Sequence, residues 1–284
     1  MKPKGKEKLK LVYTYILLIV WAGFVLFPIY WMITTSFKPK LDVFLGPKYV
    51  PWVDFKPVLQ WWHRIFTVER EEVIPPLIAS MVIATGSSVC AVILGTMAAY
   101  GLTRFRFKFG TMRNRDILVW IVSARMMPPI VVGLALFIMF RMVNLLDTWV
   151  GMILIYTAFN LPIAVWMMRN FLSQIPTSTE EAAMVDGASR AQIFLRIIIP
   201  MTLSSLMATF LLCFIFAWNE FLLALILTFD RAQTVPILIA SQHFQRGPQW
   251  WDISALSMLA IAPVVIIALC LQRYFVRGLI PIGK

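Results

Sequence analysis

The sequence predicts an all-α membrane protein with six transmembrane helices, and its composition is the first observation behind that prediction. The 284 residues are 60% hydrophobic and only 14% charged, whereas soluble domains are about 45–50% apolar and about 25% charged. The mean hydropathy is +0.79. So much apolar surface cannot be buried in one water-soluble core, and disordered chains have the opposite composition. Soluble and disordered classes are therefore excluded, and so is a nucleic-acid binder, despite the net charge of +12.

Six apolar stretches are long enough to cross about 30 Å of hydrocarbon at about 1.5 Å per residue. They are residues 11–37, 77–102, 117–141, 149–168, 201–228 and 253–276. Six helices place both termini on the same side of the membrane. The first stretch follows a lysine-rich start but is about twice as long as a signal-peptide core and lacks a small-residue cleavage motif. We therefore expect an uncleaved anchor.

The distribution of Lys and Arg predicts the orientation. Sixteen of them flank the spans on the side of the termini, against nine on the opposite side. Under the positive-inside rule both termini are cytoplasmic. The aromatic-rich and proline-rich loop 38–76 then lies outside, and the polar loop 171–200, between the fourth and fifth spans, lies inside. Without an internal repeat, residues 1–284 are predicted to form a single transmembrane domain with these two loops as candidate docking sites.

The cysteines and histidines indicate no metal site. Cys90, Cys213 and Cys270 fall inside apolar runs without ligand spacing, which is typical of small core residues and not of a disulfide framework. His63 and His243 are isolated outside the spans.

Loop 171–200 contains the signals of two short helices. Thr177, Ser178 or Thr179 can open the first, Glu180 and Glu181 occupy its first turn, where the helix dipole favours acids, and Gly187 can close it. The second is predicted over 189–198, ending at Pro200. Ala182 and Ala183 offer a small-residue face. From local chemistry alone, the loop is either a knob that docks in a groove of another protein or an interfacial helix pair with solvated charges.

The letters EEAAMVDGASRAQIFLRIIIP at 180–200 resemble the EAA loop of binding-protein-dependent ABC importer permeases. The matching positions are Glu181, Ala182, Ala183, Gly187, Ile197 and Pro200. Three further segments are similar to the smaller permease of carbohydrate importers of the maltose type: SFK at 36–38, FAWNE at 216–220 and RGL at 277–279. The resemblance covers essentially the whole chain.

In that family the loop is a coupling helix that seats in a cleft on a cytoplasmic ATPase. The resemblance implies that Glu181 meets a basic residue there and that Gly187 permits the bend between the two helices. The expected ATPase-coupling residues are Glu180, Glu181, Ala182, Ala183, Asp186, Gly187 and Arg190.

The resemblance also implies the partners of the chain. They are a second permease subunit, two ATPase subunits that carry ATP and Mg, an extracytoplasmic solute-binding protein and a carbohydrate substrate, all at a bacterial inner membrane. The chain itself would be non-catalytic and would bind no cofactor. GLIPIGK at 278–284 fits GxxxxGK, but it follows a membrane helix instead of a strand and lacks the Ser or Thr, so we expect no nucleotide site there. The family gives this tail another role, reaching toward the ATPases.

Two charged residues, Arg125 and Glu220, lie away from the ends of the predicted spans, where a charge is costly unless it faces a cavity or a partner. Arg125 would lie about 12 Å deep from the inside, and Glu220 about 28 Å from the inner end of its span, so we expect no direct pair. Trp218 and Asn219 beside Glu220 suit a sugar, because indoles stack on sugar CH faces and amides bond hydroxyls. Arg125, Trp218, Asn219 and Glu220 are therefore candidate pathway residues.

Each of these two charged residues also has an alternative role outside the pathway. Glu220 could be hydrated at the outer boundary, and Arg125 could bond helix carbonyls. Pro128 and Pro129 favour the pathway, because two prolines interrupt a helix where irregular backbone is tolerated only beside a cavity or within protein. Asn160 and Pro162 predict a weaker break in the fourth span.

Two other function classes fit less well. A polytopic membrane enzyme would need clustered carboxylates at one membrane face, but the two acidic pairs, Glu71 with Glu72 and Glu180 with Glu181, lie on opposite sides. A secondary transporter would be expected to have buried acids for ion coupling and an inverted repeat.

Overall fold

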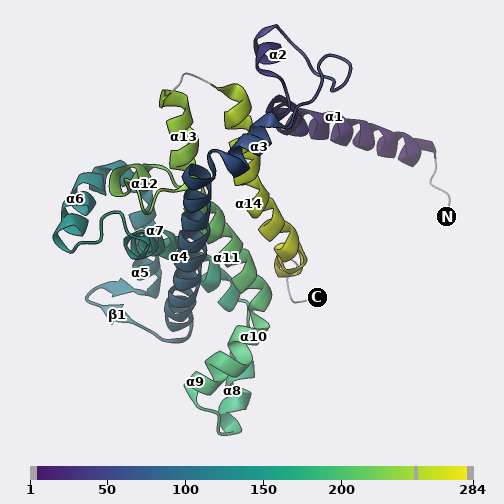
Figure 1. Cartoon of the computed structure of the whole chain (residues 1–284). Helices are drawn as coiled ribbons and strands as arrows, with labels where there is room; N and C mark the ends of the chain where they lie inside the picture. Colours follow the sequence, from purple (N-terminus) through teal and green to yellow (C-terminus); the bar gives the residue numbers. More distant parts are fainter. Residues whose placement is uncertain (1–4, 246–248, 280–284) are drawn as a thin grey trace. The chain divides into compact units, whose positions relative to one another are not determined.

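The structure is a computed structural model that describes residues 5–245 and 249–279. The backbone divides into two compact units, one of Met1–Glu71 with Ile239–Ile261 and one of Glu72–Leu238 with Ala262–Lys284. Figure 1 shows that the chain is built almost entirely of helices. A short antiparallel ribbon, β1 (Lys108–Phe109) with β2 (Met112–Arg113), is the exception and connects α4 to α5.

Four continuous helices contain apolar stretches long enough to cross a membrane. They are α1 (Gly5–Ser36), α4 (Arg70–Arg104), α7 (Trp149–Leu172) and α14 (Trp250–Leu279). Two further stretches are bent. The pair Asn114–Met126 and Pro129–Met142 turns by 86°, and the pair Arg190–Met201 and Leu203–Trp218 turns by 75°. The described residues therefore contain four candidate spans, or up to six if each bent pair is one span.

The prolines of the third predicted span do interrupt it. Helix α5 (Asn114–Ser123) continues as the 3-10 turn η1 (Ala124–Met126), and α6 (Pro129–Met142) starts anew with a proline in its first turn. The break predicted at Asn160 and Pro162 is wrong, because α7 runs through both. Half of the apolar window of α7 is buried inside the protein, and packed neighbours can hold a helix that lacks one hydrogen bond.

The fifth predicted span, 201–228, is also corrected. Helix α11 (Leu203–Trp218) stops at Trp218, and α12 (Leu222–Leu227) is a separate helix. The cause is Glu220, whose carboxylate accepts hydrogen bonds from the N–H groups of Leu223 and Ala224 and so begins a new helix.

The loop predicted over 38–76 contains two short helices, α2 (Lys40–Phe44) and α3 (Gln60–Thr67). Helix α4 begins at Arg70 and not at residue 77, with Glu71 and Glu72 near its positive end. Within the first unit, the Trp61 indole donates to the Lys38 carbonyl at 2.8 Å and stacks on Trp251 with ring centroids 5.1 Å apart. These contacts hold α3 against the ends of α1 and α14.

The core of the second unit lies where α4, α7 and α11 meet, at Ala91, Ala164 and Cys213. Gly95 is required here, because a Cβ at this position would lie 2.6 Å from the Ala164 Cβ. Of the three cysteines predicted in the core, only Cys213 is buried. Cys90 and Cys270 are exposed on apolar helices, since span helices have apolar residues on all sides and the pattern does not distinguish their faces.

Candidate functional site

The loop between α7 and α11 forms a compact pair of short helices. Helix α8 (Ser178–Val185) carries Glu180 and Glu181 in its first turn, as predicted. Gly187, with φ +80°, ends it: the Gly187 N–H donates to the Met184 carbonyl and the Ala188 N–H to the Ala183 carbonyl, both at 3.0 Å. This is the Schellman arrangement, in which a left-handed glycine closes a helix.

The second loop helix is longer and less regular than predicted. Helix α9 (Arg190–Ile193) begins with a capping box of Ser189 and Gln192. It continues as the π-helical turn η2 (Phe194–Ile198) and then α10 (Ile199–Met201), so the predicted end at Pro200 is wrong. Pro200 follows the π-helical turn inside this run of helical residues. The chain bends after Met201 instead.

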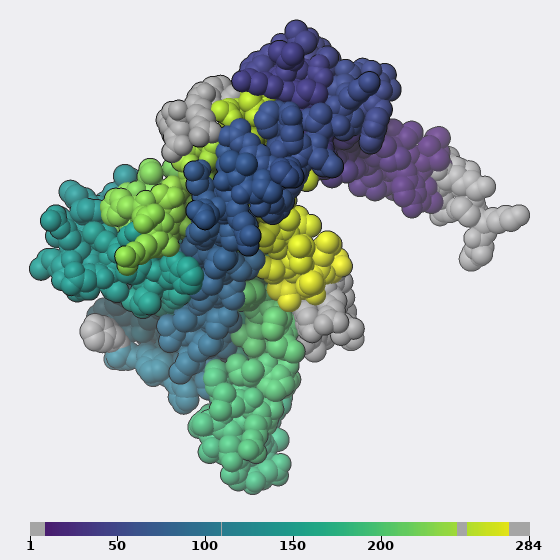
Figure 2. All heavy atoms as spheres, viewed as in Figure 1, coloured from purple at the N-terminus to yellow at the C-terminus, as the bar shows by residue number. Residues whose placement is uncertain are grey.

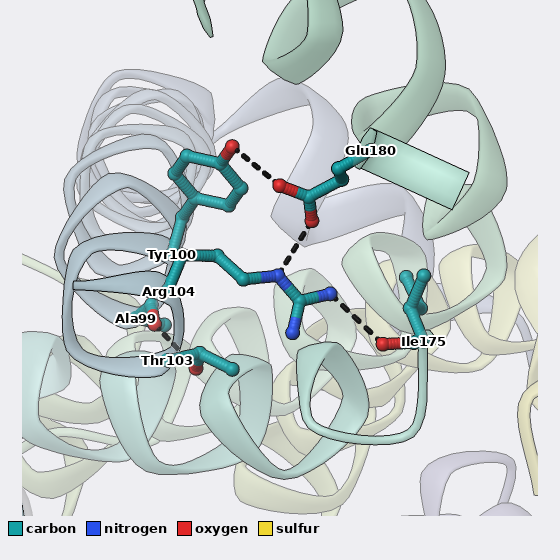
Figure 3. Close-up of polar contacts among 6 residues, drawn as sticks. All are labelled: Ala99, Tyr100, Thr103, Arg104, Ile175 and Glu180. Carbon is teal, nitrogen blue, oxygen red and sulfur yellow. Dashed lines mark hydrogen bonds and ion pairs between the residues drawn. The ribbon is translucent and has the colours of Figure 1, made fainter. Parts of the chain in front are cut away.

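A buried ion pair fixes this loop to the end of α4 (Figure 3). The Glu180 carboxylate accepts hydrogen bonds from Tyr100 Oη at 2.9 Å and from Arg104 Nε at 2.5 Å. Arg104 Nη2 donates to the Ile175 carbonyl at 2.9 Å. One arginine therefore holds both the end of the α7 segment and the first turn of α8.

An apolar cluster surrounds this ion pair and joins the loop to α4 and α7. Its buried members are Ala99, Tyr100, Met168, Leu172, Ile175, Ile193 and Ile198. Since the loop shares a core with two long helices, it can move with them as one body.

The predicted coupling residues divide into two groups. Glu180 is only 2% exposed, because Tyr100 and Arg104 hold its carboxylate inside the protein. Ala183 is half-buried against the apolar cluster. The other predicted residues, Glu181, Ala182, Asp186, Gly187 and Arg190, are exposed.

The sequence analysis missed one feature of the loop surface. Val185 is 88% exposed at the end of α8, beside the half-exposed Met184. Two apolar side chains at the tip of a polar loop were the available signal. Figure 2 shows this segment as a protruding green lobe. The surface of the loop combines Met184 and Val185 with the exposed acids Glu181 and Asp186.

Arg125, in η1, contacts both α7 and α11. Arg125 Nη1 donates to the Phe159 carbonyl and, at 3.3 Å, to Asn160 Oδ1. Its guanidinium carbon lies 4.5 Å from the centre of the Phe216 ring. Asn160 in turn donates to the Cys213 carbonyl at 3.2 Å, which links α7 to α11. Arg125 thus bonds a helix carbonyl, as a purely structural role would require, and it also lines a cavity.

Glu220 lines that same cavity of about 220 Å³, together with Tyr156. Tyr156 Oη donates to the Glu220 carboxylate at 2.8 Å. The described contacts contain no ion pair between Arg125 and Glu220. Depths counted along the two helices place these residues far apart, whereas in the structure both border one cavity.

The other two pathway candidates lie elsewhere. Trp218 is 4% exposed and stacks on Phe214 with ring centroids 5.6 Å apart, and it is not among the residues that line this cavity. Asn219 is exposed and its side-chain amide donates to the Ile215 carbonyl at the end of α11. The sequence analysis missed Tyr156 and Phe216 as cavity residues, and it assigned Asn160 only to a helix break.

Asp147 connects the segment after α6 to the segment after α12. The Asp147 carboxylate accepts hydrogen bonds from the backbone N–H groups of residues 229–232, at 3.0–3.2 Å. Burial would raise the pKa of Asp147, but these four donors outweigh it and lower the pKa below the ordinary value of 3.8.

The remaining predictions from the sequence concern metal sites and the C-terminal tail. No group of three or more His, Cys, Asp or Glu suited to a metal occurs among the described residues. Residues 280–284 of the GxxxxGK match, and the side chains of His243, Arg277 and Leu279, lie outside the described part.

Comparison with known proteins gives the family. Residues 91–281 match the model of the binding-protein-dependent transport system inner membrane component. The trehalose/maltose transport system permease protein of Thermococcus litoralis is 34% identical over 276 residues, or 96% of each chain. The trehalose transport system permease protein of Mycobacterium tuberculosis is 34% identical over 91% of this chain and 92% of its own.

A solved structure agrees on the fold. A chain of a bacterial ABC transporter involved in the import of the acidic polysaccharide alginate superposes with a TM-score of 0.75 at 22% identity, covering 97% of this chain and 99% of that one. The family match spans well over half of the sequence, and this chain belongs to the binding-protein-dependent transport system inner membrane components.

Proposed function

We propose that this chain is the smaller permease subunit of an ABC importer for a carbohydrate, in the cytoplasmic membrane. The observation that carries the proposal is the match along almost the whole length to two permeases named for trehalose or maltose. The chain forms half of the translocation pathway and does not itself hydrolyse ATP. It spans the membrane six times with both termini in the cytoplasm, which the two bent pairs and the Lys and Arg distribution support.

The partners follow from this role. A second permease forms the other half of the pathway, two ATPase subunits bind and hydrolyse ATP with Mg, and an extracytoplasmic solute-binding protein delivers the carbohydrate. The exposed surface of α8, with Glu181, Asp186 and Val185, is the surface that enters the ATPase. An exposed acid beside an exposed valine suits a cleft with a basic residue next to an apolar floor.

The contacts inside the loop explain how ATPase movement would reach the membrane. When the ATPase subunits close on ATP, they displace α8. Helix α8 cannot move alone, because Glu180 is tied to Arg104 and Tyr100 on α4, and Arg104 is also tied to Ile175 after α7. The displacement therefore moves the ends of α4 and α7 together.

The cavity bordered by Arg125 and Glu220 is this chain's part of the pathway. Its volume of about 220 Å³ is below the range of about 300–1,000 Å³ typical of complete ligand sites, so the sister permease must contribute the rest. Arg125 has five N–H donors in a fixed fork. These donors bind either an anionic group or several hydroxyls of a neutral sugar.

Reconstitution tests the proposal. The chain, its sister permease, the ATPase and the binding protein are placed in liposomes, and ATP hydrolysis and sugar uptake are measured with and without loaded binding protein. We expect uptake only with ATP and the complete set, and no nucleotide crosslinking to this chain alone. Uptake by this chain without an ATPase, or specific nucleotide labelling of it, would contradict the assignment.

A further inference from the structure

The first unit contains a cavity that neither the coupling loop nor the Arg125 cavity explains. Its volume is about 650 Å³, and it lies between the end of α1 and the start of α14. The lining residues that matter here are Trp31, Thr35, Lys38, Trp250, Ser254 and Ser257. All of them belong to one compact unit.

The ends of two spans place this cavity at the membrane boundary. The apolar stretch Leu9–Ser36 ends two residues before Lys38, and the stretch Trp250–Gln272 begins at Trp250. Tryptophans such as Trp31 and Trp250 are typical of the zone where hydrocarbon meets lipid headgroups. A ligand in this cavity would therefore lie at headgroup depth.

Lys38 brings a buried positive charge to the cavity. The residue is only 2% exposed, and its ammonium lies 3.9 Å from the centre of the Trp31 ring. Among the described contacts this ammonium has no hydrogen bond and no ion pair. Ring faces attract a cation but accept none of its three N–H donors in the way an oxygen does.

The nearby acids are engaged elsewhere. Asp42 pairs with Lys48, and Asp54 accepts the N–H groups of Tyr49 and Val50 at 2.8 Å. Burial lowers the pKa of Lys38, and the charges of Asp54 and Asp42 only partly oppose this. An ammonium buried in this way is expected to have a direct counter-charge.

A second polar group in the cavity also lacks a partner. Thr35 is 3% exposed, and its hydroxyl has no hydrogen-bond partner among the described residues. Such a group is costly to bury unless something occupies the cavity and bonds to it. Ser254 and Ser257 add two hydroxyls from α14. An ammonium and an unpartnered hydroxyl that line one cavity are complementary to an anion with several oxygen acceptors.

We propose that this cavity binds the phosphate of an anionic phospholipid headgroup, with the Lys38 ammonium as its counter-charge and the Thr35 hydroxyl as a donor. Phosphatidylglycerol fits best, because its glycerol hydroxyls can bond Ser254 and Ser257. Its acyl chains would lie along α1, whose apolar window has no buried residue within the described structure. The same phosphate chemistry is offered by soluble glycerol phosphate, and the position at the membrane boundary favours the lipid.

Native mass spectrometry of the purified full chain in detergent tests this directly, by titration with dioctanoyl phosphatidylglycerol. We expect Lys38→Met to raise the dissociation constant at least tenfold and Thr35→Val to raise it about threefold. Lys40→Met is the matched control: it removes the same charge from an exposed neighbour that does not line the cavity, and binding should stay within twofold. Dioctanoyl phosphatidylcholine, with no net charge, should bind at least fivefold more weakly.

The outcomes separate the sources of the phosphate. Equal affinity in the wild type and Lys38→Met, or an equal loss in Lys38→Met and Lys40→Met, would overturn the site. Competition by free glycerol 3-phosphate as strong as that by the lipid would overturn the lipid assignment. Thermal melting without lipid checks folding, and if Lys38→Met does not fold, Thr35→Val decides: unchanged lipid binding in that variant overturns the proposal.

Discussion

Glu180 and Arg104, 76 residues apart in the chain, form an ion pair in which both side chains are almost fully buried, at 3% and 7% exposure. The neighbouring acid Glu181 is exposed. One of two adjacent acids thus fixes the loop to the transmembrane helices, and the other is free to meet a partner. The two residues should therefore respond differently to mutation.

Loss of one partner of the buried pair should loosen the loop. Glu180→Ala leaves the Arg104 guanidinium buried without its carboxylate, and removal of one partner of a buried pair typically costs about 3–5 kcal/mol. We expect amide exchange in α8 to rise by a factor of at least about one hundred, since about 1.4 kcal/mol corresponds to a factor of ten. Hydrogen exchange with mass spectrometry measures this.

The double variant provides the control for that result. Glu180→Gln with Arg104→Met removes both charges and keeps similar volumes, so it should recover much of the lost protection. Equal exchange in α8 for the single variant and the wild type would show that the ion pair does not hold the loop.

Reversal of the exposed charge should act on coupling and not on loop structure. Glu181→Lys replaces an acid that we expect to meet a basic residue of the ATPase. Substrate-stimulated ATP hydrolysis in the reconstituted complex should fall at least tenfold, while membrane insertion and α8 exchange stay normal. Glu71→Lys, the same change on an exposed acid of α4, should retain coupling. Full stimulation in Glu181→Lys would contradict the proposed docking surface.

The turn after α8 depends on a glycine for its conformation and not for space. Gly187 has φ +80°, and a Cβ placed there meets nothing within 4 Å. Gly187→Ala should therefore cost about 1 kcal/mol, the usual penalty for a left-handed residue with a side chain. Gly23→Ala is the control, because Gly23 also has open space but lies inside helix α1. Exchange at residues 183–188 should rise only in Gly187→Ala.

How much of this could be read from the sequence depends on whether the cause is local. The break at Pro128 and the end of α8 at Gly187 were predictable, because a missing N–H and a positive φ act within a few residues. The inward direction of Glu180 was not, because it is decided by Tyr100 and Arg104, about 80 and 76 residues away. Long-range partners select between two acids that look alike in the chain.

The shared cavity of Arg125 and Glu220 was hidden for a related reason. Helical rise gives a distance along one helix, but not where that helix lies relative to another, and an 86° bend follows Arg125 while a 75° bend precedes α11. The sequence revealed one interruption through its prolines. Neither the bend between Met201 and Leu203 nor the end of α11 before Glu220 has such a pair of prolines. At Glu220 the cause is the hydrogen bonds of its carboxylate to the start of α12, which no local pattern distinguishes from a simple pathway acid.

The lowered pKa of Asp147 predicts a dependence of stability on pH. The fold favours the ionised carboxylate, so the stabilisation is fully present above the ordinary pKa of 3.8 and is lost as the pH falls through the lower folded-state value. The melting temperature of Asp147→Asn should lie below that of the wild type at pH 7, and the gap should narrow only below about pH 4. A difference in melting temperature that does not change with pH would contradict this. As the control, Asp230→Asn, at an exposed neighbour, should melt at the same temperature as the wild type at pH 7.

The last prediction concerns Arg125, whose contacts leave three roles distinguishable. If the guanidinium reads an anionic group, Arg125→Lys keeps the charge and should retain most of the transport per assembled complex, while Arg125→Gln loses it. If it reads hydroxyls as a fork, both variants should lose at least tenfold, because an ammonium cannot reproduce two parallel N–H donors.

A purely structural role gives a third pattern. Arg125 bonds the Phe159 carbonyl and Asn160, so both variants would then lower the amount of assembled complex and leave transport per complex unchanged. Asn160→Ala separates this case further, because it removes one of those contacts and leaves the Arg125 charge in place. Uptake and complex yield are measured together for the three variants, with Arg141→Gln, an exposed arginine at the end of α6, as the control. Since Arg125 borders the cavity as well as the α7 backbone, we expect transport per complex to fall more than yield, and the reverse order would remove Arg125 from the pathway.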